Sequence, residues 1–553
     1  MALRSWQTDP ENVHRRRWLT LVVLCVSLVV IVVDNSILNV ALPTLARSTS
    51  QGGLGAADSD LQWIVDSYVL VFAGLLLTAG ALGDRFGRYR ALAFGLAVFG
   101  IGSGLAAFAG SSGQLIAFRA VMGIGGAFIM PATLSIITNV FTDPRERGRA
   151  IALWAGVSGI GLAIGPVTGG LLLEHFWWGS VLLVNVPIVI LGLIGGFLLI
   201  PDSRDPAAPR VDIPGAVLSI VGLATLLWGL IEGPTKGWSS TPVVGAFVVG
   251  VAVIATFLWW EAHTDEPMLD VGFFRNPRFS AASGAITLTF MAMMGVIFVL
   301  TQYLQSVLGF SPMKAGAILI PMSAVMMVLA PLSARIVERV GTKAVLGTGL
   351  LVISVALALQ TTLDASSSTL HVILVTLVLA AGMANVMAPA TESIMGSLPR
   401  AKAGVGSAVN DTTRQVGGAV GVALIGSLLA SVYRDDVREG LSGTTSEATV
   451  SAASSTVQAG VAVAHDVGGD AGARILAVTH DAFLSGYHLG VLVAACITLA
   501  AAVGVFRWLP ARASVPEDAV TPVGPDDDAD VVAVEPRDGD GGAPRAAVEG
   551  AVG

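Results

Sequence analysis

The sequence predicts an all-α integral membrane protein built from two related halves. Of its 553 residues, 54% are hydrophobic and only 13% are charged, and the mean hydropathy is +0.76. This composition is typical of chains that cross a membrane many times. A charged turn around Asp84 recurs in weaker form around Glu338, 254 positions later. Two such turns, each between apolar runs, indicate a duplicated bundle of membrane helices.

The apolar runs set the expected number of helices. A helix needs about 20 apolar residues to cross the hydrocarbon core, and by that measure the chain contains fourteen spans. They are expected at 18–45, 60–79, 91–110, 113–140, 149–172, 180–200, 213–232, 242–262, 279–304, 313–334, 344–363, 370–396, 404–432 and 484–509.

The first apolar run follows Arg15, Arg16 and Arg17, as in a signal peptide, but no small-residue cleavage site closes it. We therefore expect an uncleaved first span. With both termini in the cytoplasm, 23 of the 31 Lys and Arg residues fall in cytoplasmic segments and six in outside loops. This asymmetry follows the positive-inside rule, so we expect a multi-pass plasma-membrane protein with both ends inside.

The spacing of the two charged turns exceeds the roughly 200 residues expected for adjacent six-helix halves, so we expect an inserted helix pair. The outside loop 433–483, which is rich in Ser, Thr, Ala and Gly and can form short helical pieces, is expected to be unpacked, and the acidic tail is expected to be disordered. The expected parts are a cytoplasmic N-terminus (1–17), an N-terminal six-helix bundle (18–200), two inserted helices (201–278), a C-terminal six-helix bundle (279–509) that contains the loop 433–483, and the tail 510–553.

The turn from Gly80 to Leu92 reads Gly-Ala-Leu-Gly-Asp-Arg-Phe-Gly-Arg-Tyr-Arg-Ala-Leu. Its glycines allow a tight turn and close helix approach, and its charges can serve helix ends or neighbouring carboxylates. The stretch resembles the cytoplasmic loop signature of the major facilitator superfamily, except that Tyr89 stands where a base is usual. The resemblance implies a latch between helices, formed by Gly83, Asp84, Arg85, Gly87 and Arg88.

The fifth span carries a glycine face, because Gly161, Gly165 and Gly169 recur every fourth residue. Such a face lets another helix pack closely, and Pro166 bends the helix. Ordinary small-residue packing is one interpretation. The spacing, which ends in Gly170, also resembles the superfamily signature associated with antiporters.

Two charged residues lie inside early spans. Asp34 lies in a segment similar to the superfamily's Asp-x-Thr-x-x-Asn-x-Ala-Leu-Pro pattern, with Ser36 in place of Thr. A carboxyl group inside a membrane can exchange a proton near neutral pH, although a permanently neutral Asp in a packing hydrogen bond is the alternative. Arg119 in the fourth span resembles the arginine tied to proton coupling, with a structural ion pair as its alternative.

Further candidates for proton coupling are Asp66, Glu392, Asp411 and Arg414. Asp66 lies near the outer end of the second span, where it could bind a proton or be an interfacial carboxylate. Asp411 and Arg414 are three positions apart and can pair on one helix face. That pairing is either structural or part of the coupling machinery. Their segment resembles a run found in fourteen-span drug exporters.

Flexible methionines and aromatic rings in the spans suit a pocket for varied apolar ligands or lipophilic cations. Lipid-facing or core positions are the alternative for each of them. The candidate cavity residues are Asn39, Trp63, Tyr68, Phe290, Met294, Phe298 and Tyr303.

The resemblance therefore implies a drug–proton antiporter of the fourteen-helix branch: two six-helix bundles around a cavity, exporting an amphipathic, cationic drug or antibiotic from a bacterium. A dedicated exporter of one compound, a solute–proton symporter and a non-transporting receptor are the alternatives. We expect a monomer without enzymatic activity, and no cofactor, metal site or nucleic-acid partner. The chain has no P-loop that would indicate ATP coupling.

Overall fold

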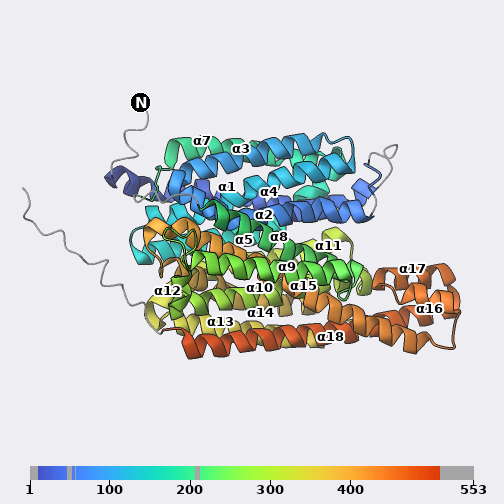
Figure 1. Ribbon diagram of the computed structural model, residues 1–553. Helices are drawn as coiled ribbons and strands as arrows, with labels where there is room; N and C mark the ends of the chain where they lie inside the picture. The colour runs from blue at the N-terminus through green and yellow to red at the C-terminus, as the bar shows by residue number, and fades with distance from the viewer. Residues whose placement is uncertain (1–9, 47–52, 57, 206–211, 511–553) are drawn as a thin grey trace, which may run out of the picture. The chain divides into compact units, whose positions relative to one another are not determined.

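The computed structural model describes residues 10–46, 53–56, 58–205 and 212–510, and its elements are helices. Figure 1 shows most of them running side by side. The α-helices are α1 (Pro10–Ala46), α2 (Asp58–Phe86), α3 (Arg88–Ala107), α4 (Ser112–Val140), α5 (Pro144–His175), α6 (Ser180–Leu183), α7 (Asn185–Leu199), α8 (Ile213–Lys236), α9 (Thr241–Glu261), α10 (Pro277–Gln302), α11 (Pro312–Ala317), α12 (Leu319–Val340), α13 (Thr342–Leu359), α14 (Thr369–Met395), α15 (Ala403–Leu441), α16 (Glu447–Ala453), α17 (Val457–Val467) and α18 (Gly469–Trp508). Short helical turns of other types are η3 (Val271–Arg275), η4 (Tyr303–Val307), η5 (Gln360–Thr362) and η6 (Arg400–Lys402).

Among the described residues, thirteen helical segments are long and apolar enough to cross a membrane. They coincide with thirteen of the fourteen predicted spans, with α6 and α7 together forming one of them. The remaining predicted span, 149–172, lies in α5, which is a helix of 32 residues. Part of α5 lies outside the described side chains, so the count of membrane-crossing segments stays at thirteen.

Local sequence explains where several helices begin. Asp143 caps α5 by accepting a hydrogen bond from the backbone N–H of Arg145, and Pro144 occupies the first turn. Asn276 caps α10 in the same way through Arg278, again with a proline in the first turn. A short polar side chain satisfies an N–H group that the helix cannot, and proline lacks the N–H that would be left unpaired.

The buried apolar side chains form two large cores that match the two halves. One core is made almost entirely by α1–α7, and the other by α10–α18 with a few residues of the inserted helices. A small third cluster joins Ala152 of α5 to Ala330, Ala384 and Ala388 of the second half. Alanines at this contact let α5, α12 and α14 approach closely across the boundary between the halves.

The inserted pair α8–α9 packs beside this boundary, with Leu223 and Phe257 contributing to the second core. Backbone and side-chain atoms of Ile220 and Ala224 in α8 lie within 4 Å of the position that a Cβ atom would take on Gly74 in α2. At the far end of α8, Trp238 donates a 2.9 Å hydrogen bond to the Ser427 hydroxyl in α15. The pair therefore contacts both halves.

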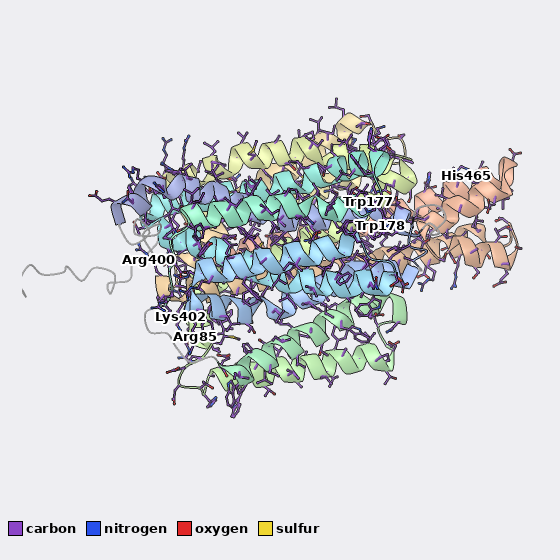
Figure 2. All side chains as sticks on the ribbon, turned by 90° about the horizontal axis from the view of Figure 1, so that it is seen from above. Arg85, Trp177, Trp178, Arg400, Lys402 and His465 are labelled. Atoms are coloured by element: carbon purple, nitrogen blue, oxygen red, sulfur yellow. The ribbon has the colours of Figure 1, made fainter. Side chains whose placement is uncertain are left out.

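The expectation that 433–483 is unpacked is wrong. α15 continues to Leu441 and α18 begins at Gly469, with α16 and α17 between them (Figure 1). Tyr433 is buried and donates hydrogen bonds to the Ala453 and Thr456 carbonyls. Figure 2 labels His465 in this helical extension, at the opposite end from Arg85, Arg400 and Lys402. We call the end that carries Asp84, Arg400 and Lys402 the latch end.

Candidate functional site

A polar cluster lies inside the first half, where α1, α4 and α7 meet. Arg119 donates a 2.5 Å hydrogen bond to Asp34 Oδ2, and Asn185 donates a 2.9 Å hydrogen bond to Asp34 Oδ1. Arg119 also donates to the Ile64 carbonyl oxygen, and its guanidinium carbon lies 4.4 Å from the centre of the Tyr68 ring. With Ile64 and Tyr68 of α2, the cluster thus joins four predicted spans and covers the cation with an aromatic face.

The Asp34 and Arg119 side chains are both 0% exposed. Burial removes the hydration of both charges. The ion pair and the hydrogen bond from Asn185 compensate for this loss. The Arg119 Nη2 atom has no hydrogen-bond partner among the described residues. The structure brings together Asp34 and Arg119, which the sequence analysis named as separate candidates for proton coupling, through a direct hydrogen bond between their charged groups.

The glycine face of α5 packs against α1 at Ser36 and Ile37, which closely follow Asp34 in the sequence. A Cβ atom on Gly165 would lie 1.8 Å from the Ser36 Oγ atom, and one on Gly169 would lie 2.8 Å from Ile37 Cγ1. Only glycine permits this approach of α5 to α1. Gly170 is half-buried in the same helix, while Gly161 and Pro166 lie outside the described side chains.

A second polar cluster lies in the other half, on α14 and α15. The closest approach of Arg414 to Asp411 is 3.9 Å, between Nη1 and Oδ1, and Arg414 Nη2 donates a 2.8 Å hydrogen bond to the Thr391 hydroxyl. Asn410 donates a 3.2 Å hydrogen bond to Asp411 Oδ1. Both charged side chains are less than a tenth exposed. The predicted pair therefore exists, but it is longer than the Asp34–Arg119 pair.

Aromatic rings from both halves hold the Arg414 guanidinium. Its carbon atom lies 5.5 Å from the Trp154 ring centre and 5.5 Å from the Phe290 ring centre. Trp154 belongs to α5 of the first half, whereas Phe290 belongs to α10 of the second. The Arg414 Nε atom has no hydrogen-bond partner among the described residues. Arg414 is thus a buried cation at the boundary of the halves, held loosely by its carboxylate and partly by a ring from the opposite half.

The predicted latch joins the two halves at one end of the bundle. Asp84 accepts hydrogen bonds from the backbone N–H groups of Gly404 (2.9 Å) and Val405 (3.1 Å), at the start of α15. A carboxylate at a helix N-terminus satisfies free N–H groups and faces the positive end of the helix dipole. Arg88 pairs with the same carboxylate at 2.7 Å and donates to the Arg400 and Ala401 carbonyl oxygens.

The turn that carries the latch depends on Gly87, whose φ of 115° strongly favours glycine. Gly83 packs against Ala91 across the turn, and Arg85 lies over the Phe86 ring at 5.3 Å. Tyr89, which departs from the superfamily pattern, is buried against Gly196 of α7. A base at this position would be taken out of water.

The weaker copy of the turn has the same geometry. Gly341 has a φ of 87° and precedes α13 as Gly87 precedes α3. Glu338 pairs across the boundary with Arg149 of α5 at 3.2 Å, as Asp84 crosses to α15. Both turns of the duplicated motif therefore place an acid against the opposite half.

Glu392 lies at the latch end and not with Asp34 and Arg119. It accepts a two-point contact from Arg147 of α5, with a closest distance of 2.7 Å. The pair adds a further link between the halves at this end. The structure therefore favours a latch role for Glu392 over the proton-coupling role that the sequence suggested.

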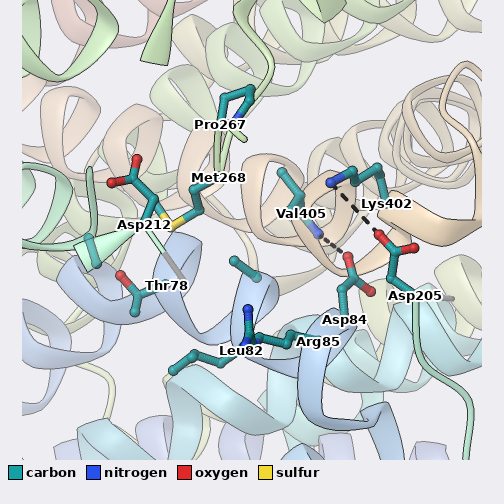
Figure 3. Close-up of a pocket in the computed structure, with 12 residues that line it drawn as sticks. Thr78, Leu82, Asp84, Arg85, Asp205, Asp212, Pro267, Met268, Lys402 and Val405 are labelled. Carbon is teal, nitrogen blue, oxygen red and sulfur yellow. Dashed lines mark hydrogen bonds and ion pairs between the residues drawn. The ribbon is translucent and has the colours of Figure 1, made fainter. Parts of the chain in front are cut away.

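A small cavity of about 30 Å³ lies beside the latch, between α2, α8, α15 and the loop after α9 (Figure 3). Its lining carries both signs of charge, from Asp84, Arg85, Asp205, Asp212 and Lys402. Lys402 Nζ lies 3.7 Å from Asp205 Oδ2, and this contact is drawn next to the Asp84–Val405 hydrogen bond in Figure 3. The linker that leads into the inserted helices therefore meets the second half here.

The Major Facilitator Superfamily model matches residues 24–422. The chain belongs to this superfamily. It is 37% identical over 487 residues to the multidrug efflux pump LfrA of Mycolicibacterium smegmatis, covering 88% of this chain and 95% of that protein. It is 33% identical to the tetracenomycin C resistance and export protein of Streptomyces glaucescens, with 90% and 93% covered. It is 31% identical to the methyl viologen resistance protein SmvA of Salmonella typhimurium, with 89% and 98% covered.

Solved structures support the superfamily fold independently. The human organic anion transporter MFSD10 superposes with a TM-score of 0.59 at 15% identity, covering 89% of this chain and 99% of that one. The proton:xylose symporter XylE superposes with a TM-score of 0.56, also at 15% identity, covering 90% and 96%. The predicted all-α major facilitator fold is confirmed.

The candidate cavity residues of this superfamily member occupy different environments. Tyr303 is fully buried and stacks on Tyr487 in the core of the second half, and Tyr68 is buried against Arg119. These packed positions do not favour a cavity wall. Met294 packs near Gly418, and Phe298 is 42% exposed. Trp63 is half-buried, whereas Asn39 lies outside the described side chains.

Asp66 lies in α2, one turn beyond Gln62, with Glu232 of the inserted helix α8 as an acidic neighbour. Glu232 itself pairs with Lys236 at 3.3 Å. Among the residues that the structure describes, no hydrogen bond or ion pair joins Asp66 to Asp34. Asp66 is instead associated with the inserted pair.

Sequence reasoning missed Asn185, Thr391 and Trp154. Asn185 and Thr391 are polar residues inside apolar runs, so the cost of burying their unpaired groups was an available signal. Trp154 gave no such signal in the sequence, because aromatic residues are common in the packed interior of membrane-spanning helices. Its importance appears only when α5 is placed against α15.

Proposed function

We propose that this protein is a proton-coupled efflux transporter that exports amphipathic organic cations across the plasma membrane of a bacterium. The observation that carries the proposal is the buried Asp34–Arg119–Asn185 cluster. A carboxyl group that is 0% exposed and bonded to a guanidinium is a group whose proton affinity changes when the guanidinium moves. Relatives named for multidrug efflux and methyl viologen resistance support drug export.

Alternating access supplies the movement. The two halves are linked at the latch end by Asp84, Arg147 and Glu338, each of which contacts the opposite half. We infer that this end is cytoplasmic, because the basic residues Arg85, Arg400 and Lys402 gather there (Figure 2). The arrangement described here is then closed toward the cytoplasm, and both termini lie inside.

In the proposed cycle, a proton entering from outside neutralises Asp34 and loosens its bond to Arg119. Because the glycine face of α5 leaves no space against Ser36, a shift of α1 is transmitted to α5. α5 carries Trp154 and Arg147, which contact the other half. The proton gradient is thus the energy source, and this cycle involves neither a cofactor nor catalytic chemistry. A monomer contains all of these parts.

The substrate class rests on the acids and rings at the boundary of the halves. Asp411 is a buried carboxylate whose own arginine is 3.9 Å away, and the Trp154 and Phe290 faces attract positive charge. Methyl viologen, for which one relative is named, is a flat aromatic dication. A cationic amphipathic substrate matches this environment.

A second candidate is a dedicated exporter of one antibiotic. It is favoured by the relative named for tetracenomycin C resistance and export, which this chain covers over 93% of its length. Both candidates share the fold and the latch, so the distinction concerns substrate breadth alone.

The test uses purified protein in liposomes with a pH-sensitive dye inside. Adding ethidium or methyl viologen with an imposed proton gradient should produce drug movement and opposite proton movement, and a protonophore should abolish the drug movement. Drug movement that ignores the protonophore would refute proton coupling. Movement of one antibiotic but no cation would establish the dedicated exporter instead.

A further inference from the structure

The linker that leads into the inserted helices runs along the latch turn. The Ser203 carbonyl oxygen accepts a 2.9 Å hydrogen bond from the backbone N–H of Arg88, and the Asp205 N–H donates a 2.7 Å hydrogen bond to the Asp84 carbonyl oxygen. These two backbone bonds fix residues 203–205 against the first half. The first part of the linker is therefore held in place ahead of α8, which begins at Ile213.

Asp205 faces the second half from this fixed position. Its side chain is only 3% exposed, and its Oδ2 atom lies 3.7 Å from Lys402 Nζ. Lys402 directly precedes α15, whose first N–H groups bind Asp84. The carboxylates of Asp84 and Asp205 thus approach the start of α15 from two segments, one through hydrogen bonds to the backbone and one through charge.

The inserted pair contacts the first half through α2, and it contacts the second half at both of its ends and through Leu223 and Phe257 in the second core. α8 packs on α2 at Gly74, the linker reaches Lys402 at the latch end, and Trp238 reaches Ser427 at the other end. When the halves separate at the latch end, α15 must move away from α2, and Lys402 must leave Asp205. The pair then breaks while the backbone bonds to Arg88 and Asp84 remain within the first half.

We propose that Asp205 and Lys402 form a second inter-half lock, distinct from the Asp84 latch, through which the inserted helix pair stabilises closure of the latch end. The assignment rests on the proposed function only in assuming that the halves open and close. Separation breaks the Asp205–Lys402 ion pair, and the loss of this attraction disfavours the open arrangement. Neutralising either residue therefore shifts the equilibrium toward opening.

A cysteine placed at the closed contact can measure this opening. The Ala408 Cβ atom lies 2.8 Å from the position of a Cβ on Gly80 and is 0% exposed, so it becomes reachable only when the halves part. The reporter protein carries Ala408→Cys with Cys25→Ala and Cys496→Ala. Its labelling rate with a hydrophilic maleimide, in nanodiscs that expose both membrane faces, reports the open fraction.

Lys402→Gln and Asp205→Asn should each raise the labelling rate about fivefold, as loss of a moderate ion pair predicts. The exchange Asp205→Lys with Lys402→Asp should return the rate to within about twofold of the reporter protein. Lys402 is 32% exposed, so Lys402→Gln and Lys402→Glu decide the question if the Asp205 variants do not fold.

Asp202→Asn is the matched control. Asp202 lies in the same linker but pairs with Arg90 at 3.2 Å, inside the first half. Asp202→Asn should leave the labelling rate unchanged. A general disturbance of the linker would instead raise the labelling rate in Asp202→Asn as well as in Asp205→Asn and Lys402→Gln. Equal rates in the reporter protein, Lys402→Gln and Lys402→Glu would overturn the lock.

The labelling assay needs neither drug nor proton gradient, so it separates the two proposals. A labelling response in a protein that exports no drug would reject the proposed function and retain the lock. Drug export by a protein whose labelling rate is unchanged by the Lys402 substitutions would retain the proposed function and reject the lock.

Discussion

Replacing Asp34 with Asn removes the negative member of a fully buried ion pair while preserving the shape of the side chain. Arg119 would then retain the Ile64 carbonyl and the Tyr68 ring as partners, but no opposite charge bonded to it. An uncompensated buried charge costs about 3–5 kcal/mol. We expect Asp34→Asn to lower the free energy of unfolding by that amount and to abolish proton-driven drug export.

The double variant Asp34→Asn with Arg119→Gln removes both charges. Because two neutral side chains need far less hydration than one charge, its unfolding free energy should recover to within about 1–2 kcal/mol of the original protein, while transport stays absent. Unfolding can be followed by helix content as denaturing detergent is added to mixed micelles. Export is followed in liposomes with an imposed proton gradient.

Stability and transport therefore separate in this pair of variants. A single Asp34→Asn variant that is as stable as the original protein would mean that Asp34 is already neutral, and the reasoning from a buried ion pair would be wrong. Normal proton release with substrate in the same variant would move coupling to the Asp411 cluster. Asn185→Leu serves as a control, because it removes a hydrogen bond to Asp34 but no charge. It should cost about 1–3 kcal/mol.

Three further predictions follow from single contacts. Asp84→Asn should insert normally in membranes but transport at least about tenfold more slowly, measured as initial efflux rate, because it weakens the charge–dipole contact to α15; a normal rate would reduce the latch to a topology signal. Trp154→Leu should impair export and Trp154→Phe should restore part of it, because an aromatic face holds Arg414; equal rates in the two variants would contradict this. Arg17 holds the pKa of Glu146 below its ordinary value by hydrogen bonding. The small stabilisation from this surface pair is present above the unfolded pKa of Glu and is lost as pH falls through the lower folded pKa, so Glu146→Gln should flatten the acid limb of a thermal-stability profile.

Hydropathy predicted the helices well because each must bury about 20 apolar residues in lipid. The predicted start of span 4 at 113 and its end at 140 lie within one residue of α4. The tight turn after Asp84 was also predicted, since glycine permits backbone conformations such as the positive φ that Gly87 adopts. These features depend on local sequence or on the solvent, and both can be read along the chain.

The extension 433–483 was mispredicted because composition was weighed above spacing. Its Ser, Thr and Gly residues suggested a loop, but Tyr433, Val437 and Leu441 recur every fourth residue and are all buried. That period indicates a helix face. Contacts between the halves, such as that of Trp154 with Arg414, could not be predicted from the sequence for another reason. They depend on how the two bundles pack against each other.

The length of α15 has a mechanical consequence. The helix runs for 39 residues without a proline, which corresponds to about 58 Å. It begins at the Asp84 contact, carries Arg414 two to three turns later, and ends in the extension beyond Tyr433. A tilt of about 5° pivoting at the latch would carry Leu441 sideways by about 5 Å at the far end. The extension is thus the part of α15 that moves farthest when the helix tilts about the latch, and a binding protein that clamps α16 and α17 would resist opening from the opposite face of the membrane.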